Sequence, residues 1–345
     1  MKLNLLVYAA FQDEANVVET IIKCGLNINP PEKVLGASMI NAICNSHMAT
    51  LYLLGLFVHY GANVNYRSDK GKTPLMMAVH CQRETIVEYL IKKGAKVNIL
   101  DRQDHSPLSL AVKYKNEHIV KLLIDAGADV TLNTSGLYSS MIKQPLDCAI
   151  YNQDLNLLKL FITKGADIVY ALHYAAIYGN LEIIEELINT RAKDNLNNIG
   201  NVSDYCRAWQ GNYTPIVYAA ILDRTEIVQA LINYGAKIDP LILYYIFENI
   251  YGEDNLPLRT MNLLIDNGAE ADAVNDQGNT LLFTVVDEAF AELEEKYLPI
   301  IQLLIERRAD VNRQNPKTGD TPLHLACAMF NLSAVELLLK AGAKG

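Results

Sequence analysis

The chain has 345 residues, of which 50% are hydrophobic and 20% are charged, and its formal net charge at pH 7 is −9. This composition excludes an intrinsically disordered chain, and the acidic balance argues against a general binder of nucleic acid or of anionic membranes. No apolar run is long enough to cross a membrane and no signal peptide is evident, so we expect a soluble cytoplasmic protein without membrane insertion.

The sequence repeats itself at a fixed period, most clearly over residues 67–130. Pro74 and Pro107 lie 33 residues apart (107 − 74), and so do Gly94 and Gly127. A period of this length is typical of solenoid proteins, in which each repeat is one supersecondary unit. Each repeat has the pattern of two short amphipathic helices that cannot bury their apolar faces alone, so we expect neighbouring repeats to stack and share a core.

The start of the first helix in many repeats is marked by a proline that follows a threonine or serine. Proline suits the first turn of a helix because its missing N–H has no partner there, and the preceding hydroxyl can cap the helix. The signals, complete or partial, predict first helices that begin near Pro74, Pro107, Pro145, Pro215, Pro240, Leu281 and Pro322. The segment Ala171–Ala176 has neither signal but keeps the small residues that let paired helices approach closely, so we expect another first helix there.

The end of the second helix is marked by a Gly-Ala dipeptide or a variant of it. Glycine is favoured because the residue after a helix often takes a positive φ, which glycine adopts without steric cost. The signal occurs at Gly25, Gly61, Gly94, Gly127, Gly165, Arg191, Gly235, Gly268, Arg308 and Gly342. Arginine replaces glycine at two of these positions, so we expect those two helix ends to be built differently.

These endings predict a single domain of ten repeats, with asparagines at 65, 98 and 312 that bond the turn backbone. The approximate repeats are residues 1–29, 30–65, 66–98, 99–131, 132–168, 169–196, 197–239, 240–272, 273–312 and 313–345. Insertions interrupt the period at 132–143, 195–212 and 287–299, and we expect the last, an acidic stretch, to lengthen a first helix or the turn after it. The final repeat reads like an internal one, which suggests that the natural chain continues past Gly345.

The internal spelling of the repeats resembles the ankyrin repeat family. Thr-Pro-Leu opens one helix, Ile-Val-x-x-Leu-Ile forms the second and Gly-Ala ends it, in several copies at one period. The resemblance implies an all-α ankyrin-repeat solenoid of stacked helix-turn-helix units joined by β-hairpin-like loops. It further implies a non-enzymatic protein–protein interaction module, such as an adaptor or scaffold, without a cofactor. We expect one or more protein partners, no nucleic acid, and a monomer.

The resemblance also implies where a partner would bind, namely along a concave groove lined by the first helices and at the hairpin tips. Aromatic and aliphatic side chains occupy the middle groove positions, where polar residues are the default, and such anchors are favoured in interface cores. The predicted groove residues are Tyr114, Tyr151, Tyr178, Ile221 and Leu222, with His80 and Lys113. The predicted tip and insertion residues are Asp69, Lys70, Arg102 and Trp209.

Simpler interpretations stay open for these residues. Distorted repeats would pack some of the tyrosines into the core, and the charged tips would be ordinary solvated loops. Trp209 is either an exposed contact for a partner or a plug that folds back onto the repeats. The acidic run in 287–299 is interpreted as a solvated helix face.

Catalytic and metal-binding motifs are absent from the sequence, and its six cysteines lie far apart without a C-x-x-C pair. An enzyme would have to use Cys44 with His80, which adjacent repeats would bring within about 10 Å of each other, too far for proton transfer without favourable rotamers. A third interpretation is a microbial or viral effector that acts on host proteins in the host cytoplasm. Its activity could also reside in a region beyond the given sequence.

Overall fold

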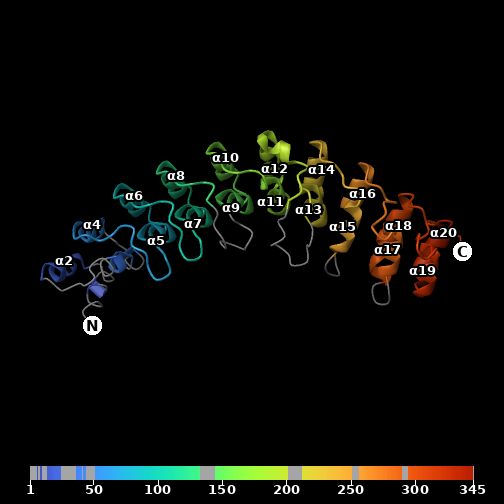
Figure 1. Cartoon of the computed structure of the whole chain (residues 1–345), viewed down its shortest axis with the longest axis horizontal. Helices are drawn as coiled ribbons and strands as arrows, with labels where there is room; N and C mark the ends of the chain where they lie inside the picture. Colours follow the sequence, from blue (N-terminus) through green and yellow to red (C-terminus); the bar gives the residue numbers. More distant parts are fainter. Residues whose placement is uncertain are drawn as a thin grey trace. The chain divides into compact units, whose positions relative to one another are not determined.

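The computed structural model describes residues 6, 8–9, 14–24, 36–40, 42–43, 51–132, 144–200, 212–250, 256–289 and 294–344. Within these residues the regular secondary structure is helical, and the β-bridges Gly200–Tyr213 and Val274–Thr280 are isolated. The predicted all-α fold is therefore confirmed. The chain forms two compact parts, Met1–Asp167 and Ile168–Gly345, which we call the N-terminal and C-terminal parts (Figure 1).

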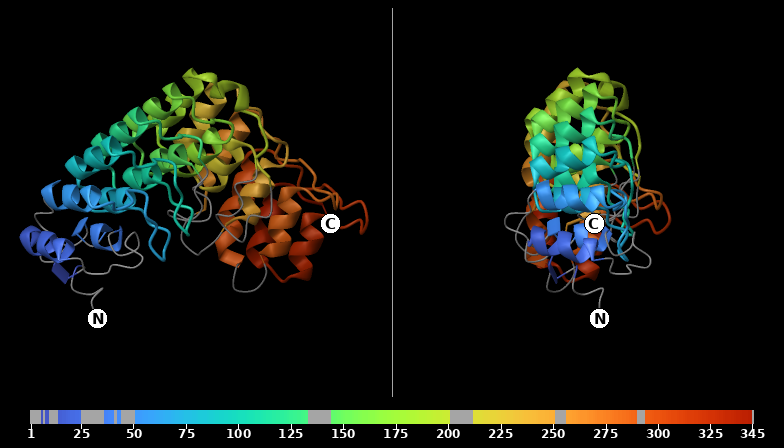
Figure 2. Two further views of the ribbon diagram at one scale, coloured as in Figure 1. Left: turned by 60° about the vertical axis from the view of Figure 1, so that its left-hand side comes forward. Right: turned by 90° about the vertical axis from the view of Figure 1, so that its left-hand side faces the viewer.

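The N-terminal part consists of short helices that stack in register. First helices contact first helices (α5 with α7, α7 with α9) and second helices contact second helices (α2 with α4, α6 with α8), and the members of this stack lie side by side in Figure 2. The helices are α2 (Ala15–Lys23), α4 (Leu51–His59), α5 (Pro74–His80), α6 (Glu84–Lys92), α7 (Pro107–Lys113), α8 (Glu117–Asp125), α9 (Pro145–Tyr151) and α10 (Leu155–Thr163).

The C-terminal part repeats the same stacking. First helices from α11 to α19 contact one another in succession, as do second helices from α12 to α20. The elements are α11 (Ala171–Tyr178), α12 (Leu181–Asn189), the 3₁₀ helix η1 (Arg191–Asn195), α13 (Pro215–Ile221), α14 (Thr225–Asn233), α15 (Ile242–Glu248), α16 (Leu258–Asp266), α17 (Leu281–Glu288), α18 (Glu294–Glu306), α19 (Pro322–Ala328) and α20 (Leu332–Lys340).

The predicted starts of the first helices are largely confirmed. Five of them begin with proline at the first position, and the hydroxyls of Thr73 and Ser106 accept hydrogen bonds from Met76 N (3.2 Å) and Ser109 N (3.0 Å). The prediction for Pro240 is wrong by two residues. Asp239 Oδ1 accepts a bond from Leu241 N (2.8 Å), which forms a turn before α15, and that helix begins only at Ile242.

The helix ends contain one confirmed and one wrong expectation about arginine. Gly94 and the other described glycines of the pattern have positive φ, as predicted. Arg308 also has a positive φ of 64°, so this end keeps the common geometry and is not built differently, as we had expected. At Arg191 the chain instead continues into η1 after α12.

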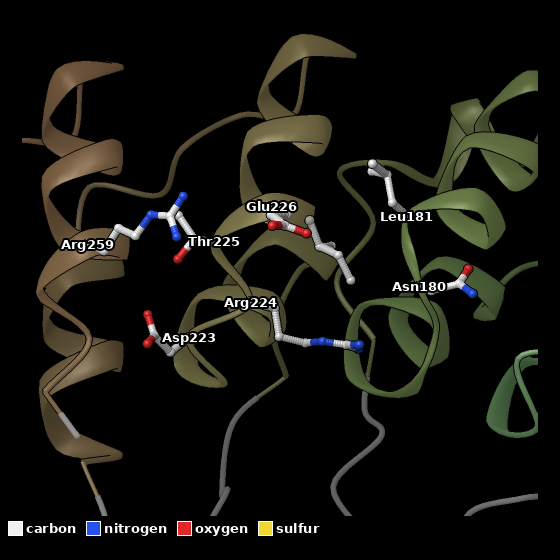
Figure 3. A pocket seen from close by; sticks show the side chains of 8 residues that line it. Asn180, Leu181, Asp223, Arg224, Thr225, Glu226 and Arg259 are labelled. Carbon is white, nitrogen blue, oxygen red and sulfur yellow. The ribbon is translucent and has the colours of Figure 1, made fainter. Parts of the chain in front are cut away.

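The missing turn after α11 is compensated by a side chain from the next repeat. Gly179 has an extended backbone, with φ −69° and ψ −176°, in place of the left-handed turn. The guanidinium of Arg224 donates to Ala176 O (3.1 Å) and to Gly179 O, which satisfies carbonyls at the end of α11 (Figure 3). Arg224 is half-buried, and its burial lowers the pKa of the guanidinium.

The acidic stretch in 287–299 does not lengthen the first helix, contrary to our expectation. The first helix α17 ends at Glu288, and the second helix α18 begins early, at Glu294, and runs for 13 residues instead of 9. Most of the other two insertions, 133–143 and 201–211, lies outside the described residues, as do residues 290–293.

Asparagines at the loop positions connect each repeat to the next one. Asn98 donates from Nδ2 to Gly127 O (3.1 Å) and accepts at Oδ1 from Asp129 N (2.9 Å). Asn65 and Asn312 make the same two bonds to the turn that follows them by one repeat. These side chains therefore fix the spacing between neighbouring hairpins as well as satisfying polar backbone groups.

A buried histidine holds the described start of the longest insertion against α11. The Nε2 atom of His173 lies 2.9 Å from Asn198 O, and Gly200 approaches the ring so closely that a Cβ there would lie 2.7 Å from Nε2. The hydroxyl of Tyr218 donates to Gly200 O (3.1 Å). Burial lowers the pKa of His173 from 6.5 to about 4, although its bonds to the backbone of Asn198 and Tyr213 act in the opposite direction.

Replacing Arg308 by glycine should stabilise the protein, because an L-residue in the left-handed region is strained by about 1 kcal/mol and glycine is not. We expect Arg308→Gly to raise the free energy of unfolding by up to about 1 kcal/mol in chemical denaturation. The matched control is Gly268→Ala, one repeat earlier, where φ is 103° and an added Cβ meets no atom within 4 Å. That variant should lose a similar amount, and a destabilised Arg308→Gly would contradict the strain argument.

The stability of the C-terminal part should fall between pH 6.5 and pH 4 because of His173. In the unfolded chain this imidazole takes up a proton near pH 6.5, whereas in the folded chain it does so only near pH 4, so acid favours unfolding in this range. The difference corresponds to roughly 3 kcal/mol. Denaturation of His173→Gln at pH 7 and pH 4.5 should show a smaller pH dependence than the unmodified protein. The exposed-histidine control His118→Gln should behave like the unmodified protein, and equal slopes for all three would refute the assignment.

Candidate functional site

Three of the predicted groove residues of the N-terminal part lie at the C-terminal ends of neighbouring first helices. His80 ends α5, Tyr114 is the C-cap of α7 and Tyr151 ends α9. The Nδ1 atom of His80 lies 2.5 Å from the hydroxyl of Tyr114, and the two rings meet edge to face with centroids 5.2 Å apart. Because α5, α7 and α9 stack in succession, the sequence correctly brings His80 and Tyr114 together.

Tyr151 extends this row and is the most open of its tyrosines, with 41% of its surface exposed. Its neighbour Asn152 donates to Val112 O (3.3 Å), which ties the end of α9 to α7. Tyr114 is half-buried, and burial raises the pKa of its phenol, with a smaller contribution from Cys81. The phenol therefore keeps its proton at neutral pH and can act as a hydrogen-bond donor.

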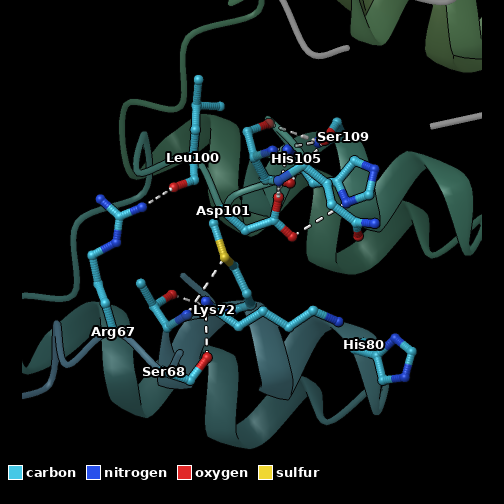
Figure 4. A network of polar contacts seen from close by, with 12 residues as sticks. Arg67, Ser68, Lys72, His80, Leu100, Asp101, His105 and Ser109 are labelled. Carbon is cyan, nitrogen blue, oxygen red and sulfur yellow. Dashed lines mark hydrogen bonds and ion pairs between the residues drawn. The ribbon is translucent and has the colours of Figure 1, made fainter. Parts of the chain in front are cut away.

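Two lysines complete this site, and we call Lys72, His80, Lys113 and Tyr114 the His80 cluster. The pKa of His80 is lowered first by partial burial and then by the positive charges of Lys72 and Lys113. Figure 4 shows the Lys72 side chain reaching along α5 toward His80. The imidazole is therefore predominantly neutral at pH 7, and the cluster presents two ammonium groups beside a hydrogen-bonded His–Tyr pair.

The predicted groove residues of the C-terminal part are less open. Ile221 is only 9% exposed and belongs to the core, because α13 packs against both α11 and α15, so its prediction as a partner contact is wrong. Tyr178 and Leu222 are half-buried at the ends of α11 and α13. The predicted five-residue stripe is thus divided between the two parts, and each part carries its own portion.

The predicted tip residues Asp69, Lys70 and Arg102 are all exposed. The two tips are held together by backbone contacts, since Arg102 N donates to Lys70 O (3.1 Å). Gly71 lies at this contact with φ 77°, and a Cβ there would come within 2.8 Å of Arg102 N, so no other residue fits. In addition, the guanidinium of Arg67 donates to Leu100 O (2.7 Å; Figure 4).

Not every charged tip residue faces solvent. Asp101 is 3% exposed and accepts bonds from the backbone N–H groups of Gln103 (2.8 Å) and His105 (2.9 Å). Its other oxygen lies 3.3 Å from His105 Nδ1, and His105 is buried as well. These two residues shape the tip and are not contacts for a partner, although the sequence places them beside Arg102.

The sequence gave no indication of a pocket in the C-terminal part. This pocket has a volume of about 330 Å³ and is lined by residues from the starts of α12, α14 and α16, among them Asn180, Arg224, Glu226 and Arg259 (Figure 3). A second pocket of about 410 Å³ adjoins it and shares Thr225, Glu226 and Arg259. Only the packing of three successive repeats brings these residues together, so no local motif could have revealed them.

Polar groups in the pocket wall are already engaged with one another. Thr260 donates to Asp223 Oδ1 (2.6 Å), and its hydroxyl lies 2.7 Å from that of Thr225. Arg224 is bonded to the end of α11, as described above. This wall is therefore chiefly a connection between repeats, and the pocket offers a shallow polar surface.

Two sequence predictions cannot be placed. Cys44 and Trp209 lie outside the described residues, so neither the Cys44–His80 pair nor the role of the tryptophan is addressed. Within the part of the chain that the structure describes, no group of three or more His, Cys, Asp or Glu side chains could hold a metal ion. No helix among the described residues has the length and apolar character needed to cross a membrane.

Comparison with protein families gives one match, which covers most of the chain. The family described as "Ankyrin repeats (3 copies)" matches residues 39–134, 143–241 and 253–345. These ranges include every helix pair from α5 to α20.

Curated relatives are similar over parts of their length. Ankyrin repeat protein nuc-2 of Neurospora crassa is 28% identical over 207 residues, which are 56% of this chain and 17% of nuc-2. The nuclear factor NF-kappa-B p105 subunit of Gallus gallus is 34% identical over 180 residues, 50% of this chain and 16% of p105. A putative ankyrin repeat protein of Rickettsia felis is 26% identical over 209 residues, 58% of this chain and 50% of that protein. The chain thus spans at most half the length of these relatives.

Removing one lysine of the His80 cluster should raise the pKa of His80. In Lys72→Gln the nearest listed positive charge is lost, so protonation of the imidazole becomes less unfavourable. The measurement is an NMR titration of the His80 ring, with Lys92→Gln on α6 as the control for the loss of one positive charge elsewhere. A pKa of His80 that does not change in Lys72→Gln would show that the lysine does not act on the ring.

Proposed function

The chain belongs to the ankyrin repeat family, whose repeats are generic protein–protein interaction modules, and we propose that it binds a partner protein through its first-helix ends and hairpin tips. In this proposal the protein has no enzymatic activity of its own and acts as an adaptor or scaffold. The activities of the longer relatives are not transferred, because the chain spans only a fraction of them.

The observation that carries the proposal is the row His80, Tyr114 and Tyr151 at the ends of three stacked helices. Aromatic side chains with a polar group are favoured in interface cores, because the ring buries apolar area while the polar atom finds a partner. The helices that hold this row are fixed by the shared core, in which Leu75, Val79 and Leu110 are buried. A partner would therefore meet a surface that loses little conformational entropy on binding.

The exposed tips Asp69, Lys70 and Arg102 supply the second element. Charges at the rim of an interface influence the rate of association and the choice of partner more than the affinity. In the C-terminal part, Tyr178 and Leu222 are the candidates for contacts, and Trp209 is a further candidate in the insertion.

A microbial or viral effector is a second form of the same function. Its motivation is the similarity to a putative ankyrin repeat protein of Rickettsia felis, together with the irregular insertions. An effector would capture a partner from a eukaryotic lysate and not from a bacterial one, whereas a module for an endogenous bacterial partner would show the reverse.

Capture from both lysates should depend on Tyr151. We expect Tyr151→Ala to retain at most about one-tenth of the partner that the unmodified protein captures, as for a hot-spot residue. Because this side chain is 41% exposed, the free energy of unfolding should change by less than about 1 kcal/mol. The matched control is Tyr52→Ala on the second helix α4, where the tyrosine is 57% exposed.

Equal capture by Tyr151→Ala and the unmodified protein would refute a partner site at this row. A large loss of stability in Tyr151→Ala would instead assign the tyrosine to the core, which is the simpler interpretation considered from the sequence. Failure of the unmodified protein to capture any partner from either lysate would count against the proposed function itself.

A further inference from the structure

The His80 cluster has a charge opposite to that of the whole chain. The formal net charge of the protein is −9, yet Lys72 and Lys113 both act on His80. The tips above it carry both signs, with Arg67, Lys70 and Arg102 near Asp69 and Asp104, so the positive character is strongest at the helix ends. A cationic site on an acidic protein attracts acidic ligands locally while the remainder of the surface repels them.

The nearest carboxylate on the following first helix does not offset these charges from an exposed position. Asp147 is 7% exposed and accepts a hydrogen bond from Gln144 N (3.0 Å) at the start of α9. It therefore serves the N-terminus of that helix, where a negative charge is favourable. The Asp101 carboxylate is likewise engaged inside its own tip.

The cluster also holds hydrogen-bonding groups in fixed positions. The bond between His80 Nδ1 and the Tyr114 hydroxyl orients both rings, and it leaves Nε2 as the ring nitrogen that a ligand can reach. His80 itself is exposed. A carboxylate accepts hydrogen bonds from ammonium and imidazole N–H groups, and such charge-assisted bonds are the stronger ones.

We propose that the His80 cluster binds an acidic segment of the partner protein, with its carboxylates placed between Lys72 and Lys113. This inference deepens the proposed function and rests on it, because it assigns the chemistry of the segment that the first-helix row receives. An acidic peptide is favoured over a nucleic acid because two lysines at one locus match a few carboxylates. A phosphate backbone requires a longer basic track, which the acidic chain does not provide.

The test uses fluorescence anisotropy with a fluorescein-labelled octa-glutamate peptide as the probe. An octa-asparagine peptide of the same length and a single-stranded octathymidylate serve as comparison probes. We expect the glutamate peptide to bind the unmodified protein more tightly than either comparison probe, with an affinity that falls as salt is added. No binding of the glutamate peptide, or tighter binding of the oligonucleotide, would overturn the proposal.

Charge reversal locates the binding. In Lys72→Glu with Lys113→Glu we expect the Kd for the glutamate peptide to rise at least about tenfold. The matched control, Lys164→Glu with Lys237→Glu, makes the same change in net charge at exposed positions away from the cluster. An equal loss in both double variants would show a net-charge effect alone and would overturn the assignment.

A measurement on the unmodified protein avoids dependence on the folding of the variants. Addition of the glutamate peptide should shift the NMR signals of the His80 ring, and unchanged signals at saturating peptide would overturn the proposal. Failure of these peptide experiments would leave the Tyr151-dependent capture unaffected, whereas failure of that capture would count against the proposed function, so the two outcomes are distinguishable.

Discussion

The stacking of each repeat on the next is the interaction on which the rest of the structure depends. A pair of helices as short as α5 and α6, with 7 and 9 residues, is marginal alone and exposes an apolar face. Neighbours bury that face in one continuous core, and residues such as Leu75, Val87 and Leu90 are fully buried there. The loop asparagines add hydrogen bonds between hairpins, so the spacing of the repeats is specified both in the core and at the loops.

This arrangement separates stability from recognition. Core positions must be apolar and of matching size, whereas the residues that end each first helix face outward and can vary without affecting the stack. The His80 cluster and Tyr151 use this freedom in the N-terminal part. In the C-terminal part the same positions are largely occupied by packing, with Ile221 buried and Arg224 used to complete the end of α11.

Backbone strain is distributed over the turns of the repeats. Gln82, Lys115, Gln153, Asp223 and Phe330 all have positive φ between 53° and 57° in the turn that joins the two helices of a repeat. Each pays a small steric cost that the stacking of neighbouring repeats over-determines. Phe330 is also 90% exposed, which makes it the most solvent-accessible large apolar side chain among the described residues.

The sequence alone determined the helical repeat, most helix starts and the positive-φ glycines, because proline, capping hydroxyls and glycine act through their own backbone geometry. It also placed His80 near Tyr114, since one period carries a residue to the same position on the next helix. Only the tertiary structure decided the burial of Ile221, Asp101 and His105, the early start of α18 and the pocket beside Arg259. Those outcomes depend on atoms from two or three repeats that meet in space, and such contacts leave no local pattern in the chain.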